Sequence, residues 1–176
     1  TAFSGEAPHI ATRDACIVAP ASANFIASLA HGRTDTPATA LAASYLGQGK
    51  PVVVLPNMHE SLARSPVVEA NLQAIEARVT VLKPRMEEHK RKFPEPRNLA
   101  DVLAHLINRR ALAKPNVLVS LGTTRGYIDD VRYISNYSSG ALGSHIAEEL
   151  YRRGFQTSVV AGPCQIYPQS FTECHH

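Results

Sequence analysis

The chain has 176 residues, of which 44% are hydrophobic and 19% are charged, and its formal net charge at neutral pH is +3. These values are ordinary for a globular protein that buries one good core or two small ones. No apolar run approaches the roughly 20 residues that span a bilayer, so we expect no membrane association.

The three cysteines, Cys16, Cys164 and Cys174, are odd in number and lack the Cys-x-x-Cys spacing of zinc or redox sites. No basic-then-apolar leader opens the sequence, and we therefore expect a reducing, cytoplasmic environment. Cys174 is followed by His175 and His176, but adjacent histidines at a chain end can rarely surround one ion. We expect a tail there and no metal site.

The densest positive charge lies between Lys83 and Arg97 and centres on Lys90, Arg91 and Lys92. Such a run usually forms a solvated surface loop, and contact with a phosphorylated small substrate is the second interpretation. Aromatic residues are sparse in this segment, so we expect no nucleic-acid partner.

Short apolar strands alternate with helix signals along the whole chain. Thr36-Pro37 and Ser65-Pro66 each combine a capping residue with a proline suited to the first helical turn. The alternation predicts an α/β fold whose mostly parallel sheet is flanked by helices. The predicted strands lie near 14–19, 51–55, 79–82, 116–121 and 156–161, and the predicted helices near 23–31, 36–47, 66–77, 97–111 and 141–153.

A boundary is predicted between Asn108 and Pro115, because a helix ending in Arg109-Arg110 gives way to a new strand. We expect one domain over residues 1–112 and the start of a second α/β unit over 113–176. A less favoured alternative is that the strand–helix–strand of 116–161 completes the first domain in one permuted sheet.

The segment from Ile17 to Phe25 carries the clearest functional signal. A buried strand stops at Pro20, and Ser22 and Asn24 then open an apolar helix. Backbone N–H groups and short polar side chains thus gather at the carboxyl edge of a sheet, where open α/β folds bind nucleotides and flavins.

With His9-Ile10 before this Pro-Ala-Ser-Ala-Asn turn and Gly32-Arg33-Thr34-Asp35 after it, the segment resembles the homo-oligomeric flavin-containing cysteine decarboxylases. That family includes phosphopantothenoylcysteine decarboxylase and the peptidyl-cysteine decarboxylases. The resemblance implies a flavodoxin- or Rossmann-like sheet, here without its usual first strand–turn–helix, and FMN bound at a subunit interface. It also implies a catalytic, proton-handling role for His9, and cofactor contacts from Pro20, Ser22, Ala23, Asn24 and Asp35.

Structural explanations compete with each of these roles. His9 could be a loop histidine without a function, although an imidazole with a pKa near 6.5 suits proton transfer. Ser22 and Asn24 could cap a helix whether or not a ligand binds. Asp35 could help to start the helix that follows it.

The family's second motif, Pro-x-Met-Asn-x-x-Met-Trp, is altered here to Pro56-Asn-Met58-His59-Glu-Ser-Leu62-Ala63. The resemblance implies a cofactor contact from Met58. His59 takes the place of the asparagine that binds the substrate carboxylate, and a histidine can still meet a carboxylate, better when it is protonated.

The family's mobile lid carries a cysteine and glycines, but residues 83–96 contain neither. Only the end of the motif, Phe93-Pro-Glu-Pro96, is kept. Because the lid cysteine is the proton donor of the reductive step, we expect at most the oxidative half of that chemistry.

The stretch from Val117 to Gly143 resembles the opening of phosphopantothenate–cysteine ligase, a CTP-dependent enzyme with which Mg²⁺ is expected. The resemblance implies that Asn136 handles the acyl-cytidylate intermediate and that Asp129, Arg132 and Ile134 lie at a dimer contact. Ala141-Leu142 replaces a Lys-Met pair, and the later half of the ligase is not in these residues. Substrate contacts are predicted for Gly122, Arg132, Ser138, Ser139, Gly140 and Gly143.

The two motif series occur in the order of the bifunctional coenzyme A biosynthesis proteins of bacteria and archaea. The leading hypothesis is therefore a partial or divergent member: a homo-oligomeric decarboxylase and ligase acting on phosphopantothenate derivatives with FMN and CTP. One alternative is a flavoprotein of altered chemistry, either a reductase or an oxidative thiol decarboxylase. Another is a non-catalytic regulatory subunit.

Overall fold

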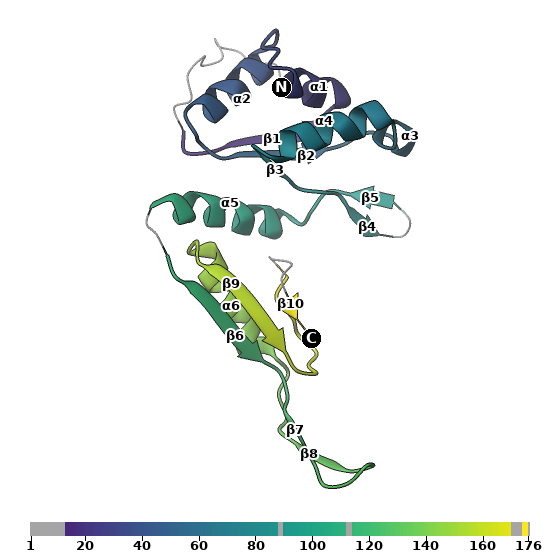
Figure 1. The fold of residues 1–176 in the computed structure, drawn as a ribbon, viewed down its shortest axis with the longest axis vertical. Helices are drawn as coiled ribbons and strands as arrows, with labels where there is room; N and C mark the ends of the chain where they lie inside the picture. The colour runs from purple at the N-terminus through teal and green to yellow at the C-terminus, as the bar shows by residue number, and fades with distance from the viewer. Residues whose placement is uncertain (1–12, 88–89, 112–113, 170–173, 176) are drawn as a thin grey trace. The chain divides into compact units, whose positions relative to one another are not determined.

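The computed structural model describes residues 13–87, 90–111, 114–169 and 174–175. The chain divides between Pro94 and Glu95 into two compact units (Figure 1).

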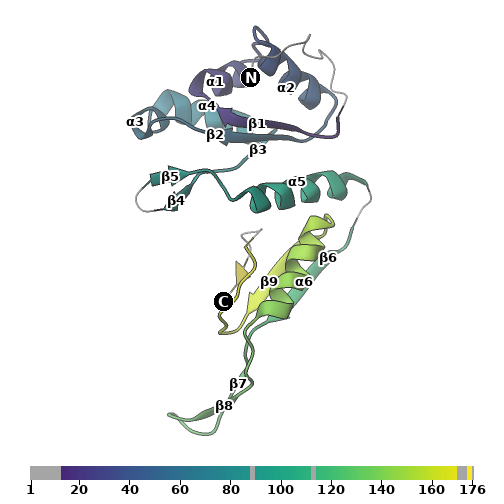
Figure 2. The same cartoon turned by 180° about the vertical axis from the view of Figure 1, so that it is seen from behind.

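The first unit is built on a parallel sheet of β1 (Cys16–Ala21), β2 (Val52–Pro56) and β3 (Thr80–Val81), in that order. Cys16 pairs with Val52, and Val53 pairs with Thr80. Four helices accompany the sheet: α1 (Ala23–Ala30), α2 (Pro37–Gly47), α3 (Glu60–Ala63) and α4 (Pro66–Glu76). Helices α1 and α4 pack side by side (Figures 1 and 2).

Strand β2 forms the centre of this unit's core. Val52, Val53 and Val54 are almost fully buried, which is typical of a parallel strand covered on both faces. Ile26 of α1 and Ile75 of α4 pack into the same core.

Helix α2 begins where its sequence predicts, because Thr36 and Thr39 form a capping box. Each Oγ1 accepts the other residue's backbone N–H at 3.2 Å. Pro37 occupies the first turn, where it has no intrahelical hydrogen bond to lose.

The basic segment, predicted to be a loop, contains an antiparallel pair of strands, β4 (Arg85–Glu87) and β5 (Lys90–Lys92). Arg85 lies opposite Lys92. Backbone hydrogen bonds can pair two charged strands without any apolar alternation, so the sequence pattern gave no strand signal here.

The second unit begins with α5 (Pro96–Ala111) and contains a second parallel sheet, of order β10-β9-β6. Its strands are β6 (Asn116–Leu121), β9 (Gln156–Ala161) and β10 (Cys174–His175). Helix α6 (Ala141–Arg152) connects β6 to β9 and packs on both, with Ala147 against Val119 and Val159. Between β6 and α6 in the sequence, β7 (Arg125–Tyr127) and β8 (Tyr133–Ser135) form an antiparallel hairpin.

Helix α5 makes its contacts with α6, although its sequence position predicts the end of the first domain. His105 Nδ1 lies 2.9 Å from Tyr151 O, and Asn108 donates to Arg152 O at 2.7 Å. Lys114, just after α5, donates to Arg153 O. These donors satisfy carbonyl groups that the C-terminus of a helix otherwise leaves unpaired.

The predicted α/β fold with parallel strands is confirmed. All five predicted strands and all five predicted helices are present, and their bounds differ by two residues at most. The domain division and the alternative of one permuted sheet stay predictions; β6 and β9 pair with each other in parallel. Among the described residues, no helix combines the length and apolar character needed to cross a membrane.

Candidate functional site

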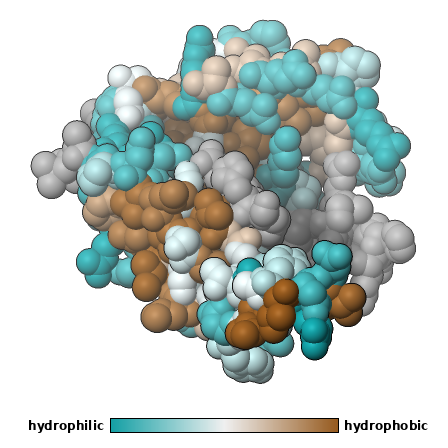
Figure 3. Space-filling view, turned by 60° about the horizontal axis from the view of Figure 1, so that its bottom comes forward, coloured by the Kyte–Doolittle hydropathy of each residue, from teal (hydrophilic) through white to brown (hydrophobic). Residues whose placement is uncertain are grey.

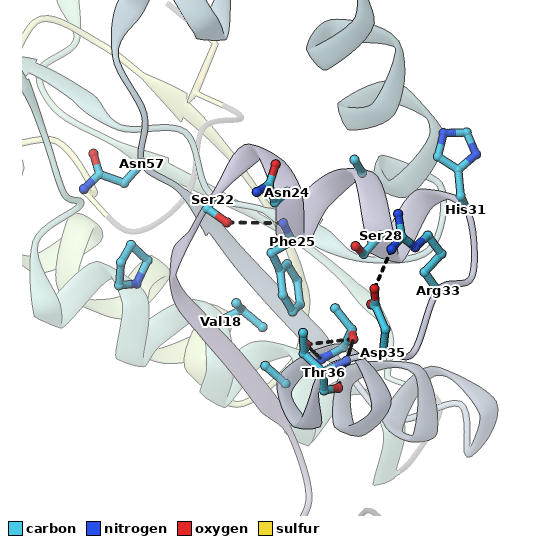
Figure 4. A pocket seen from close by; sticks show the side chains of 14 residues that line it. Val18, Ser22, Asn24, Phe25, Ser28, His31, Arg33, Asp35, Thr36 and Asn57 are labelled. Atoms are coloured by element: carbon cyan, nitrogen blue, oxygen red, sulfur yellow. Dashed lines mark hydrogen bonds and ion pairs between the residues drawn. The ribbon is translucent and has the colours of Figure 1, made fainter. Parts of the chain in front are cut away.

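A cavity of about 700 Å³ lies beside α1 at the carboxyl end of β1, and we call it the α1 pocket (Figure 4). Its size suits a cofactor or small-molecule ligand. Figure 4 places Asn57 at one end and His31 at the other, with the Phe25 ring between them. Its lining residues are Val18, Pro20, Ser22, Asn24, Phe25, Ala27, Ser28, His31, Arg33, Asp35, Thr36, Ala38, Thr39 and Asn57.

The predicted turn residues stand at the start of α1. Ser22 is the N-cap, and its Oγ accepts the Phe25 N–H at 3.2 Å. Pro20, Ser22 and Asn24 line the α1 pocket, whereas Ala23 begins the helix and is not part of the lining. The capping role predicted for Ser22 is therefore present together with a position in the pocket wall.

Asp35 lines the same pocket, and Arg33 donates to its Oδ2 at 2.5 Å. Both side chains are about half or more exposed, so the pair contributes at most about 1 kcal/mol to stability. Thr36, not Asp35, caps α2. The pair instead balances charge at one end of the α1 pocket.

A second cavity, of about 410 Å³, lies where β2 and β3 end and is flanked by α3 and α4; we call it the α4 pocket. Asn57 lines both the α4 pocket and the α1 pocket. Met58, predicted as a cofactor contact, lines the α4 pocket instead of the α1 pocket. The lining residues are Pro56, Asn57, Met58, Ala63, Arg64, Glu69, Leu72, Glu76, Val81, Lys83 and Pro84.

His59 caps α3, with its Nδ1 2.8 Å from Ser61 Oγ and 3.3 Å from Ser61 N. It lines neither pocket. Sequence comparison with the family motif pointed to His59 but passed over Asn57, two residues earlier. A polar residue directly after a buried strand was the available signal.

His9, the predicted proton-handling residue, lies outside the described residues. Within the described residues, no three His, Cys, Asp or Glu side chains form a group that could hold a metal ion.

In the second unit, Asn136 closes the base of the β7–β8 hairpin. Its Oδ1 accepts the Thr124 N–H at 2.9 Å, and the Ser135 hydroxyl donates to Thr124 O at 2.9 Å. The side-chain amide of Asn136 is thus held by a backbone contact that fixes its position.

The three glycines predicted to contact the substrate lie where other parts of the chain approach closely. A Cβ on Gly122, whose φ is +91°, would lie 2.5 Å from Gly162 O, and one on Gly140, with φ +83°, would lie 2.6 Å from Ile166 O. A Cβ on Gly143 would collide with Leu121. These close approaches leave no room for a Cβ, so the three positions require glycine.

Ser138 and Ser139 lie at the N-terminus of α6. Their hydroxyls accept the N–H groups of Gly140 and Ala141, each at 3.4 Å. Bonds of this length are weak, so these N–H groups remain suited to a stronger acceptor such as a phosphate oxygen.

Arg132 binds Asp129 within the turn of the hairpin. Arg132 Nε donates to Asp129 Oδ2 at 2.7 Å, and the N–H groups of Val131 and Arg132 donate to Oδ1 at 3.0 and 2.7 Å. The side-chain hydrogen bond from Arg132 and then these two N–H groups lower the pKa of the Asp129 carboxyl. The predicted substrate contact Arg132 thus has a local structural partner.

The hairpin, which the resemblance predicts to hold a dimer contact at Asp129, Arg132 and Ile134, exposes several apolar side chains. Val131 is 87% exposed, and Tyr127, Ile128 and Ile134 are 60–71% exposed. Figure 3, in which the bottom of Figure 1 comes forward, shows brown apolar side chains on this side. Large exposed apolar patches are common at interaction surfaces.

Comparisons with known proteins support the motif analysis. The family model described as "Flavoprotein" matches residues 3–108. The chain belongs to this Flavoprotein family. A second model, "DNA/pantothenate metabolism flavoprotein C-terminal domain", matches residues 112–176. The predicted resemblance to the coenzyme A biosynthesis flavoproteins is confirmed.

Among curated relatives of this Flavoprotein member, the coenzyme A biosynthesis bifunctional protein CoaBC of Thermococcus kodakarensis is 34% identical over 153 residues. The match covers 86% of this chain and 38% of the relative. CoaBC of Haemophilus influenzae is 32% identical, with 87% and 40% covered. The chain therefore spans about two fifths of the length of these relatives.

One solved structure similar to the chain is the FMN-dependent cysteine decarboxylase TvaF from thioviridamide biosynthesis. It is 34% identical, with a TM-score of 0.41 over 46% of this chain and 50% of that one. The peptidyl-cysteine decarboxylase EpiD is 26% identical, with a TM-score of 0.46 over 51% and 54%.

Proposed function

We propose that the first unit binds FMN in the α1 pocket and takes part in decarboxylating phosphopantothenoylcysteine in coenzyme A biosynthesis. The observation that carries this proposal is the convergence of Pro20, Ser22, Asn24 and Asp35 on one cavity. These residues come from the two motifs that the chain shares with flavin-containing cysteine decarboxylases. The named functions of its relatives favour this chemistry over altered flavin chemistry or a purely regulatory role.

The residues of the α1 pocket fit a flavin. Val18 and Phe25 offer apolar surface to a planar ring, and the polar groups of Ser22 and Asn24 stand at the N-terminus of α1. When bound, FMN supplies a two-electron acceptor for oxidation of the substrate thiol.

The chain's own groups bind, orient and shield the substrate. The amide of Asn57, a residue that lines both pockets, can donate to a carboxylate. The apolar walls of the pockets exclude water from the reacting group. His9 remains the proposed proton carrier.

The second unit is proposed to be the start of a CTP-dependent ligase domain that also uses Mg²⁺. The weakly bonded N–H groups of Gly140 and Ala141, supported by Ser138 and Ser139, would receive a phosphate. Asn136 would contact the activated acyl group. The exposed apolar hairpin would provide the dimer contact of a homo-oligomer.

The direct test is flavin uptake followed by turnover. Purified chain incubated with FMN should retain a yellow chromophore after gel filtration, and Asn24→Ala should lower its affinity for FMN about tenfold through a lost hydrogen bond. Loaded protein should then release CO2 from phosphopantothenoylcysteine. A protein that stays colourless at saturating FMN contradicts the proposal.

A further inference from the structure

The charged side chains of the α1 pocket gather in one part of it. Among the described residues that line this cavity, Arg33 is the one arginine or lysine and Asp35 the one acid, and His31 adds a third titratable group. Figure 4 shows these three on the side away from Asn57, whereas the neutral amide of Asn24 lies nearer to Asn57. The cavity therefore has a neutral polar end and a charged end.

Arg33 is held beside the cavity and stays accessible to a ligand. Its Nη2 donates to Asp35 Oδ2 at 2.5 Å, and its side chain is 67% exposed. A guanidinium carries five N–H donors in a planar fork, so it can bind a second acceptor while one donor is bound to a carboxylate. Phosphate oxygens match the spacing of these donors, which makes a phosphate a suitable second acceptor.

The start of α2 adds positive potential to the same cavity. Thr36, Ala38 and Thr39, from the cap and first turn of this helix, belong to the lining. The aligned peptide dipoles of a helix place a partial positive charge at its N-terminus, and this charge stabilises a nearby anion. It offsets the negative charge of Asp35, so the potential near Arg33 favours an anionic group over a neutral one.

We propose that Arg33 binds the phosphate of FMN and thereby selects FMN over riboflavin, which has the same ring and ribityl chain but no phosphate. The ring then lies toward Asn24 and Asn57, at the neutral end of the cavity. The resemblance described above assigns a flavin contact to Asp35 and none to Arg33. This inference rests on the proposed function, because it gives the flavin an orientation within the α1 pocket.

The experiment measures binding without turnover. FMN and riboflavin both fluoresce, and each is titrated with the full chain at low salt. FMN should bind at least about fivefold more tightly than riboflavin, because a charge-assisted contact at an exposed site contributes about that factor. Arg33→Gln should reduce the ratio of the two affinities to about twofold or less and leave the affinity for riboflavin unchanged. Arg33→Lys keeps the charge but loses the planar fork, so it should give an intermediate ratio.

The matched control is Arg78→Gln. Arg78 is an exposed arginine of the same unit and lines neither pocket, so this variant loses the same charge at a different place. It should keep the wild-type ratio, which separates a local contact from an effect of net charge. Raising the salt concentration should lower the ratio in the wild type and leave it unchanged in Arg33→Gln.

Equal binding of FMN and riboflavin by the wild type, or an unchanged ratio in Arg33→Gln, overturns the inference and leaves flavin binding standing. Binding of neither flavin refutes the proposed function, and the inference fails with it. The affinity of Arg33→Gln for riboflavin shows whether this variant is folded, so a lost preference is not mistaken for unfolding.

Discussion

Asn57 and His59 are two residues apart, yet they serve different purposes in this structure. Asn57 lines both pockets, whereas the His59 ring caps α3. Asn57→Ala should raise the KM for phosphopantothenoylcysteine about 10- to 100-fold, because it removes a hydrogen bond to a charged group. His59→Ala should change KM less than about threefold.

Two features make the Asn57 comparison decisive. The backbone hydrogen bond from Asn57 N–H to Ala21 O, at 3.0 Å, remains in Asn57→Ala. Asn57→Asp keeps the shape but places a negative charge beside the substrate carboxylate, so it should impair KM at least as much as Asn57→Ala. If His59→Ala raises KM more than Asn57→Ala and Asn57→Asp do, His59 and not Asn57 binds the substrate carboxylate.

Gly122 shows how tightly the end of β6 packs against the end of β9. Gly122→Ala should lower the free energy of unfolding by more than about 2 kcal/mol, because φ is +91° and the Cβ would lie 2.5 Å from Gly162 O. Gly126→Ala, in the same unit, is the control, since its Cβ meets only Ile134 O at 3.9 Å. Urea unfolding followed by circular dichroism gives the free energy of unfolding of both variants. Equal decreases in Gly122→Ala and Gly126→Ala would contradict the close approach of Gly122 to Gly162.

The contact between α5 and α6 contains a titratable group. His105 is 6% exposed, stacks on Tyr151 at 4.1 Å and has Nδ1 2.9 Å from Tyr151 O, so Nδ1 carries the proton. Burial lowers the pKa of His105 below its ordinary 6.5; the hydrogen bond to Tyr151 O opposes this, and the cations Arg109 and Lys114 add to the lowering.

The unfolded chain therefore binds a proton at His105 more readily than the folded chain. Its contribution to stability is present above pH 6.5 and falls as the pH drops below that value, by at most about 1.4 kcal/mol per pH unit. Subtracting the unfolding free energies of His105→Gln from those of the wild type between pH 7.5 and 5.0 isolates this term. A difference that does not vary with pH would refute it.

The β7–β8 hairpin is the element on which the proposed homo-oligomer depends. Val131 and Ile134 are 87% and 70% exposed. Val131→Asp with Ile134→Asp should dissociate the assembly, because it places charge in an apolar contact. Light scattering coupled to gel filtration measures the mass, with Val67→Asp, exposed on α4 of the other unit, as the control. An unchanged mass would exclude the hairpin as the contact.

At the scale of the whole chain, elements were predictable where residues signal them locally. Thr36-Pro37 gave the start of α2, and the valine run gave β2. The β4–β5 and β7–β8 hairpins gave no such signal, because their pairing depends on backbone contacts between residues of unremarkable pattern. In the site, the Pro20–Asn24 turn was predictable, but the place of Asn57 in the walls of two cavities depends on where β2 ends beside β1.

The division of the chain gives the last prediction. The family models meet between residues 108 and 112, whereas the compact units divide between Pro94 and Glu95. Arg152 of α6 reaches back to α5, where its Nε donates to the buried Asp101 at 2.6 Å. Losing α5 would leave the carbonyls at the end of α6 with fewer donors.

A fragment of residues 95–176 should therefore resist unfolding better than a fragment of 113–176, by about 1–3 kcal/mol if both fold, because only the longer fragment keeps the contacts of His105 and Asn108 with Tyr151 O and Arg152 O. Asp101→Ala in the longer fragment removes the contact with Arg152 and should therefore abolish part of that fragment's extra stability. Denaturant unfolding gives the free energy of unfolding of the two fragments and of the Asp101→Ala variant. Equal stability of the two fragments would show that α5 belongs energetically to the first domain, as the sequence boundary proposes.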